Sequence, residues 1–220
     1  VEFSEGNILY KETISDVSEG VGHYEPLRHY AEVHLLIEPC DCNGITFESK
    51  CSEDILDKNW QKLIKTHVFE KEHRGVLIGS PITGIKITLV SGKAHIKHTE
   101  GGDFRQATYR AIRNGLAKNK SVLLEPYYNF KIEVPKENIG RVMSDVQVRY
   151  GTFSQPQTIN DVSVIKGEIP VSTMQGYITE FNSYTKGKGK MSFNVCGYKP
   201  CHDSEEVIEN SEYDFDSDIE

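Results

Sequence analysis

The feature of this sequence that most constrains its fold is the interruption of strand-like segments by helix-like ones along its whole length. Apolar or alternating runs bounded by turn residues predict β-strands. They are Ile8–Ile14, His29–Glu38, Ile45–Cys51, Ile82–Val90, Tyr127–Val134, Thr152–Gln157, Ser163–Ile169 and Met191–Gly197. The predicted helices between them are Asn59–Glu72, Asp103–Lys118, Lys136–Arg149 and Val171–Tyr184. This mixture indicates an α+β or α/β-sandwich fold rather than an all-α or all-β one.

The second half of the chain has the order strand, helix, strand, strand, helix, strand, which is the βαββαβ order of a ferredoxin-like sandwich. The first of these helices follows Pro135 and ends before Gly151, as proline and glycine preferences at helix ends predict. We therefore predict two domains, at residues 1–120 and 121–201, with the boundary near Lys120-Ser121.

The acidic residues are unevenly distributed. The formal net charge is -8, but nine acids and no Lys or Arg lie from Asp203 to the end, so the first 202 residues carry 24 acidic and 25 basic side chains. Net charge therefore does not exclude an RNA partner. The segment 202–220 has few apolar residues, and we expect a mobile acidic tail or linker whose removal leaves stability unchanged.

No apolar run approaches the roughly 18 residues of a membrane span, and the N-terminus has no signal-peptide pattern. The first residue is Val1 rather than Met. We expect a piece of a longer cytoplasmic protein without a membrane partner.

The five cysteines form an odd set without paired Cys-x-x-Cys motifs. Cys40-Asp41-Cys42, Cys51 and a nearby histidine could in principle hold zinc, and Cys201-His202 could add ligands. The preferred interpretation is reduced thiols and no metal.

Motifs for an enzyme were sought next. The sequence contains no Gly-x-x-x-x-Gly-Lys-Ser/Thr loop, Gly-x-Ser-x-Gly elbow or His-Glu-x-x-His helix. Gly187-Lys188-Gly189-Lys190 follows a predicted helix instead of preceding one, so it is read as a turn with a glycine cap. We expect this chain neither to bind nor to hydrolyse GTP and to need no cofactor.

The polar segment Ser91–Gly102 joins a β-branched strand to a helix and begins a basic region. Between Ser91 and Lys120 there are seven Lys or Arg residues and two acids. Helical spacing places Arg105, Arg110 and Arg113 within an arc of about 140°. Such a surface attracts phosphate backbones, although an ordinary solvated basic face has the same pattern. His95 and His98 could contact RNA or act as general acid–base groups, but no nucleophile or carboxylate pair accompanies them at telling spacing.

At this loop the sequence resembles elongation factor G, whose fourth domain has a strand, then Asp-Gly-Ser-Tyr-His-Asp-Val-Asp-Ser-Ser-Glu, then a helix with an early Phe. Leu89–Phe104 aligns with it without a gap, matching Gly92, His95 and Phe104. Tyr10–Ile14 is similar to the Tyr-Arg-Glu-Thr-Ile that opens the same domain. Leu123–Pro126 repeats the Leu-Leu-Glu-Pro that opens the fifth. Further matches in the fifth domain are Gly140, Asp145, Arg149, Gly151, Pro170, Met174, Gly176, Tyr177, Thr185, Gly187, Gly189 and Tyr198.

The sequence also departs from the elongation factor pattern. Ile96, Lys97 and His98 replace acidic residues of the loop, and Arg149-Tyr150 replaces paired arginines. Gly20–Leu27 replaces a glycine-rich turn before the second strand. Asp103-Phe104-Arg105 is similar to the Asp-Phe-Arg of the tetracycline ribosomal-protection branch, although the prolines of that branch's loop are absent. We therefore expect a specialised relative rather than a plain translocase.

The resemblance implies a ribosomal protein S5 domain 2-like module, which reaches the decoding centre of the small subunit, followed by a ferredoxin-like domain near the stalk base and sarcin–ricin loop. Residues 1–6 could be the end of the preceding third domain. GTP hydrolysis with Mg would belong to a domain absent from this chain. The expected partner is the ribosome, not DNA, and the protein is expected to be a monomer. The expected RNA-binding residues are Lys93, His95, Lys97, His98, Thr99, Arg105, Arg113 and Arg149.

Three functions remain open at this point. Tetracycline ribosomal protection is preferred, and translocation or ribosome rescue is the alternative within the family. A hydrolase that uses His95 or His98 is the alternative of another class.

Overall fold

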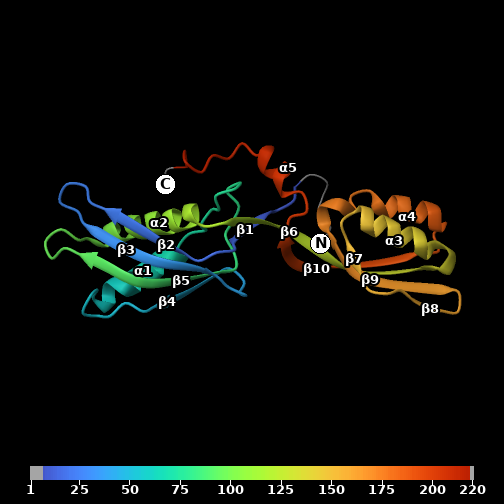
Figure 1. The fold of residues 1–220 in the computed structure, drawn as a ribbon, viewed down its shortest axis with the longest axis horizontal. Helices are drawn as coiled ribbons and strands as arrows, with labels where there is room; N and C mark the ends of the chain where they lie inside the picture. The colour runs from blue at the N-terminus through green and yellow to red at the C-terminus, as the bar shows by residue number, and fades with distance from the viewer. Residues whose placement is uncertain (1–6, 219–220) are drawn as a thin grey trace. The chain divides into compact units, whose positions relative to one another are not determined.

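The computed structural model describes residues 7–218, which form two compact units (Figure 1). The N-terminal unit comprises residues 11–123 together with the end of the chain from Glu206, and the C-terminal unit comprises residues 124–205 with the segment before Lys11. The expected remnant of a preceding domain, residues 1–6, lies outside the described residues. The units divide between Leu123 and Leu124, a few residues beyond the boundary placed from the sequence.

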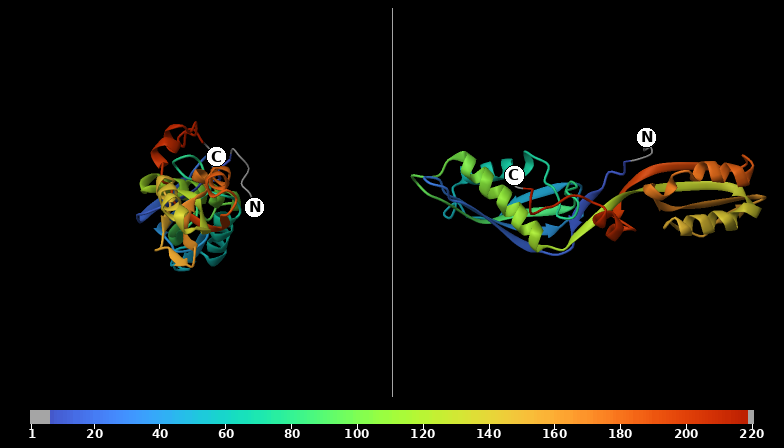
Figure 2. Two further views of the ribbon diagram at one scale, coloured as in Figure 1. Left: turned by 90° about the vertical axis from the view of Figure 1, so that its right-hand side faces the viewer. Right: turned by 90° about the horizontal axis from the view of Figure 1, so that it is seen from above.

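The N-terminal unit contains a four-stranded sheet in the order β2-β3-β5-β4. Its strands are β2 (Ser18–Tyr24), β3 (Ala31–Pro39), β4 (Ile45–Ser49) and β5 (Ile85–Ala94). β4 pairs with β5 in parallel, and the other two pairings are antiparallel. Helices α1 (Lys58–Phe69) and α2 (Gly101–Lys118) pack on the sheet (Figure 2).

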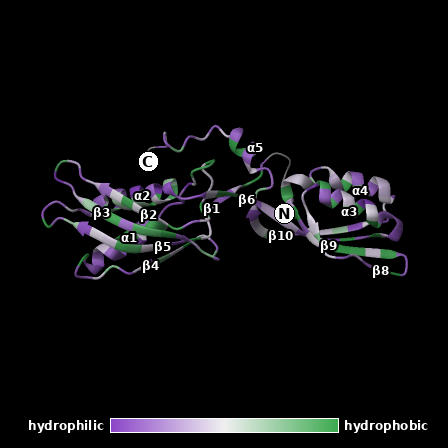
Figure 3. Ribbon diagram, viewed as in Figure 1, coloured by the Kyte–Doolittle hydropathy of each residue, from purple (hydrophilic) through white to green (hydrophobic). Residues whose placement is uncertain are grey.

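Side-chain alternation explains this packing. Every second residue of β3 from Ala31 to Ile37 is buried, as the period of two in a strand requires. On α2 the buried apolar residues Phe104, Ala107 and Ala111 recur at helical spacing. The hydrophobic segments of these elements are green in Figure 3. Asp57 caps α1 by accepting a hydrogen bond from the Asn59 backbone N–H at 2.8 Å.

Strand β2 was not predicted, because its glycines were read as part of a turn. Gly20 and Gly22 lie against the backbone of α2. A Cβ at Gly20 would lie 1.9 Å from the Ala111 carbonyl oxygen, and one at Gly22 would lie 1.7 Å from that of Ala107. Low β-propensity at these positions therefore reflects close strand–helix packing rather than a turn.

The C-terminal unit has the predicted ferredoxin-like order. β6 (Ser121–Pro135) pairs with both β10 (Lys190–Pro200) and β9 (Val162–Pro170), and β9 also pairs with the short strands β7 (Thr152–Phe153) and β8 (Gln157–Ile159). The helices are α3 (Ile139–Val148), after the single turn η1 (Lys136–Asn138), and α4 (Tyr177–Thr185), after η2 (Val171–Met174). β1 (Lys11–Ile14) also pairs with β6. The predicted α+β class with two domains is confirmed.

The acidic segment 202–220 is more ordered, in its described part, than the expected mobile tail. It contains α5 (Ser204–Glu209), and its later part contacts α2. The Arg113 guanidinium lies 4.2 Å from the centroid of the Phe215 ring and donates to the Phe215 carbonyl oxygen at 2.6 Å. Tyr213 lies where a Cβ on Gly79 would meet it, at 2.7 Å. These two aromatic residues, rather than the acids around them, give the segment its contacts.

The cysteines also differ from the reduced set that was expected. Cys40 and Cys42 form a disulfide, whereas Cys51, Cys196 and Cys201 are free. Among residues 7–218, no helix is long and apolar enough to span a membrane.

Candidate RNA-binding tip

Two neighbouring loops at one end of the β2-β3-β5-β4 sheet form a surface that we call the tip. It consists of residues 25–30, between β2 and β3, and residues 95–100, between β5 and α2. The loops are joined by backbone and side-chain hydrogen bonds. The Tyr30 N–H donates to the His98 carbonyl oxygen at 2.9 Å, and the Thr99 hydroxyl donates to the Tyr30 carbonyl oxygen at 2.7 Å. These bonds tie the two loops into one surface.

Asp103, in the first turn of α2, supports the tip from beneath. Its carboxylate is 3% exposed and accepts from the Glu100 backbone N–H at 2.9 Å, as in a capping box. Its other oxygen lies 2.9 Å from His29 Nδ1 in the opposite loop. Asp103 therefore connects the start of α2 with both loops.

His95 and His98 stack on each other, with ring centroids 4.6 Å apart and 19° between the ring planes. The Lys97 backbone N–H donates to His95 Nδ1 at 3.2 Å. The neutral ring therefore carries its proton on Nε2. This leaves the Nε2–H of His95 able to donate a hydrogen bond outward, for example to a phosphate or base oxygen.

The outermost side chains of the tip include apolar as well as charged ones. Ile96 is 103% exposed and Leu27 is 90% exposed, each in a different loop. Lys93 and Lys97 are exposed beside them, and Arg28 is exposed in the first loop with a φ of 69°. The tip therefore presents positive charge around exposed apolar groups. Leu27 and Arg28 were not among the predicted site residues, because they were counted within a connecting segment.

The eight predicted RNA-binding residues are divided among three places. Lys93, His95, Lys97, His98 and Thr99 belong to the tip or to the strand end beside it, and Thr99 is occupied by the bonds that join the loops. The three arginines have intramolecular partners elsewhere.

Arg105 and Arg113 lie on α2 but face protein groups. Arg105 Nε donates to Glu70 Oε1 at 2.9 Å. Arg113 is held by Phe215, with Asp218 at 3.9 Å. The positive region counted along the sequence is thus partly neutralised in the folded chain.

Arg149 belongs to the C-terminal unit. It donates to the Thr173 carbonyl oxygen at 2.6 Å and to Glu180 at 3.1 Å, and its guanidinium lies 4.6 Å from the Tyr177 ring centroid. These contacts connect the end of α3 with η2 and α4. They give Arg149 a structural explanation that does not require RNA.

The geometry gives no support to hydrolysis at His95 or His98. Within the part of the chain that the structure describes, neither ring is hydrogen-bonded to a carboxylate or to a Ser or Cys nucleophile. A general base needs a partner to activate and commonly a third group to orient it.

Comparisons with known proteins agree with this arrangement. Residues 6–120 match the sequence profile described as elongation factor G, domain IV, and residues 122–207 match that of the elongation factor G C-terminus. The chain belongs to the elongation factor G family. Its two matched regions correspond in order to the two folded units.

Two relatives within or near the family illustrate the relationship. The tetracycline resistance protein TetP of Clostridium perfringens is 33% identical over 202 residues, which are 90% of this chain and 31% of TetP. A crystal structure of a protein from Thermus thermophilus superposes with a TM-score of 0.81 at 28% identity, covering 94% of this chain and 32% of that one. The chain thus spans less than a third of the length of each of these relatives.

Proposed function

We propose that this chain is the ribosome-contacting C-terminal part of a translational GTPase and that its tip enters the decoding centre of the small subunit. The observation that carries the proposal is the pair of cross-bonded loops with Lys97, His95 Nε2, Ile96 and Leu27 directed to solvent. RNA loops are recognised by shape, backbone contacts and contact with unstacked bases. A rigid tip with donors and apolar groups suits this kind of recognition.

The GTPase activity would belong to another part of the full-length protein, which would bind GTP and Mg. The energy of hydrolysis is then used elsewhere, and the tip acts by displacing or replacing a ligand in the decoding centre without chemistry of its own. The C-terminal unit would contact rRNA near the stalk base and sarcin–ricin loop. A ribosomal partner also implies action in the cytoplasm.

Within the family, tetracycline ribosomal protection is the preferred activity. It is supported by the similarity to TetP and by Asp103-Phe104-Arg105, whose members have separate roles. Asp103 shapes the tip, Phe104 is buried in the core, and Arg105 pairs with Glu70. Translocation or ribosome rescue remains the alternative, because both would use a tip at the same place.

The activity is tested by expressing the full-length protein in tetracycline-sensitive cells. A marked rise in resistance is expected, and it should be abolished by shortening both apolar side chains together in Leu27→Ala/Ile96→Ala. Unchanged sensitivity, with the protein expressed and bound to ribosomes, would favour translocation or rescue.

The role of the tip is tested by measuring ribosome affinity over a range of salt concentrations. Lys97→Ala should weaken binding and lower the salt slope by about 0.7 to 0.9, as expected for one lost phosphate contact. Lys65→Ala is the matched control, since Lys65 is exposed on α1 away from these loops. Equal salt slopes for both variants and the parent would show that the tip is not the contact surface.

A further inference from the structure

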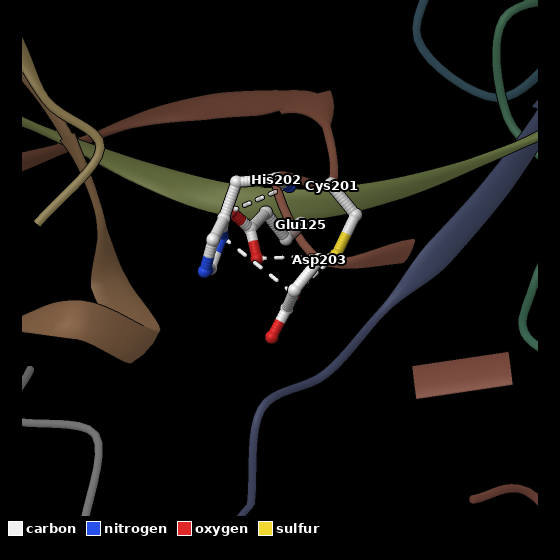
Figure 4. Close-up of side chains that lie close together, drawn as sticks. All are labelled: Glu125, Cys201, His202 and Asp203. Atoms are coloured by element: carbon white, nitrogen blue, oxygen red, sulfur yellow. Dashed lines mark hydrogen bonds and ion pairs between the residues drawn. The ribbon is translucent and has the colours of Figure 1, made fainter. Parts of the chain in front are cut away.

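Four potential metal ligands converge in the C-terminal unit, at a place that the proposed function does not use. Glu125 lies on β6, and Cys201, His202 and Asp203 are consecutive residues after β10 (Figure 4). One ligand atom from each residue lies within 4.8 Å of all the others. The side chains of Glu125 and His202 are 1% and 12% exposed, and Cys201 is also buried.

The distances within this cluster resemble those between the ligands of one ion. His202 Nδ1 lies 2.6 Å from Glu125 Oε1 and 3.6 Å from Asp203 Oδ1. Cys201 Sγ lies 3.3 Å from Glu125 Oε2 and 3.1 Å from Asp203 Oδ1. Zinc bonds of about 2.0 to 2.3 Å in a tetrahedron separate ligand atoms by roughly 3.3 to 3.8 Å. Only small adjustments would bring the four atoms to these separations.

The charges of the cluster also call for a cation. Glu125 is a buried carboxylate, and among the described residues no Lys or Arg side chain pairs with it. Without an ion, it is satisfied by the thiol of Cys201 and the imidazole of His202. Burial and the hydrogen bond to Asp203 raise the pKa of the Cys201 thiol. Burial, with the nearby Cys201, Asp203 and Glu125, also raises the pKa of Tyr10 to about 12. A divalent cation would relieve this excess of acidic groups.

We propose that Glu125, Cys201, His202 and Asp203 form a zinc-binding site. On binding, the Cys201 thiol releases its proton to water and the thiolate bonds to the ion, together with Nδ1 of His202 and one oxygen of each carboxylate. A set of one sulfur, one nitrogen and two oxygens suits Zn²⁺, whereas Mg²⁺ and Ca²⁺ prefer oxygen ligands alone.

The site is structural rather than catalytic, since four protein ligands close the coordination shell. The Tyr150 ring covers His202, with ring centroids 4.5 Å apart. Bound zinc would fasten the chain after β10 to the neighbouring strand β6. This differs from the zinc site considered from sequence, because Cys40 and Cys42 are joined to each other in the N-terminal unit.

The site is tested on the reduced chain, first stripped with a chelator and then titrated with Zn²⁺ or Co²⁺. We expect one ion per chain, a higher melting temperature with Zn²⁺, and a thiolate-to-Co²⁺ charge-transfer band in the near ultraviolet. Cys201→Ser should abolish the band and weaken zinc binding more than about tenfold. The partly exposed ligand Asp203 provides a second variant, Asp203→Asn, which should weaken binding without threatening the fold.

Cys196→Ser is the matched control, because Cys196 is a free cysteine on β10 outside the cluster and its loss should leave the band unchanged. Cys40→Ser/Cys42→Ser controls for binding at the other cysteines. The proposal is overturned if the folded, reduced chain shows no stoichiometric binding at micromolar zinc. It is equally overturned if the charge-transfer band survives in Cys201→Ser or is lost with Cys40 and Cys42.

Discussion

At the scale of single residues, Glu70 connects the end of α1 with α2. Its carboxylate accepts from Arg105 Nε and from His67 Nδ1, each at 2.9 Å, and from the Tyr109 hydroxyl. The hydrogen bond from Tyr109 is the largest cause that lowers the pKa of Glu70, to about 2, with Arg105 and His67 adding to the effect against partial desolvation. The ionised form of Glu70 is therefore favoured in the folded chain.

Glu70→Gln should reduce the free energy of unfolding at pH 7, and the reduction should depend on pH. Because the pKa of Glu70 is lower in the folded than in the unfolded state, its stabilisation is present above about 4.5 and lost as pH falls towards about 2. Urea unfolding at a series of pH values should show the parent and Glu70→Gln converging over this range. Glu72→Gln, at an exposed neighbour, is the control. A constant difference between parent and Glu70→Gln at all pH values would contradict the assignment.

The same residues show what sequence spacing could and could not predict. Spacing correctly placed Phe104, Ala107 and Ala111 in the core, because helical periodicity is a local property. It could not identify the partners of Arg105 and Arg113, since Glu70 and Phe215 are 35 and 102 residues away in the chain. Whether a basic face binds RNA or pairs internally is decided by such distant contacts.

At the scale of elements, the packing of β2 on α2 depends on matched small residues. Gly20 and Gly22 are two apart on the strand, and the carbonyls of Ala107 and Ala111 that they approach are one helical turn apart. This spacing lets the strand backbone lie directly on the helix backbone. The alternation of buried residues in β3 and β5 was sufficient to predict those strands. β2 was missed because residues selected for close approach have little β-propensity.

Gly22→Ala should destabilise the N-terminal unit by about 1 to 3 kcal/mol or more, because the added Cβ collides with backbone rather than with a flexible side chain. Gly102→Ala on α2 is the control. No atom lies within 4 Å of the Cβ that it adds, so it should be neutral or stabilise by up to about 1 kcal/mol. Denaturant unfolding measures both changes. Equal stability of the two variants would show that the strand moves away from the helix at little cost.

At the scale of the whole molecule, the order of the two domains was predictable because each contains its own core and its own periodic elements. Composition was a poorer guide to the end of the chain. A run of acids with few apolar residues predicted a mobile tail, yet two aromatic residues within it contact the N-terminal unit. Average hydrophobicity conceals single anchoring side chains of this kind.

Removal of residues 212–220 should therefore lower the free energy of unfolding of the N-terminal unit by about 1 to 3 kcal/mol, rather than leave it unchanged. A partly exposed cation–π contact contributes about 0.5 to 1 kcal/mol, and the buried area of Tyr213 and Phe215 adds to it. Phe215→Ala should reproduce a large part of the loss, since it removes the ring beneath Arg113. Asp216→Asn, at an exposed position between these contacts, should change stability by less than about 0.5 kcal/mol. Thermal and urea unfolding of the three variants would separate a contribution from the aromatic anchors from one due to acidic charge. If the truncated chain and Phe215→Ala were as stable as the parent, the segment would be an acidic extension whose contacts with α2 add nothing to stability.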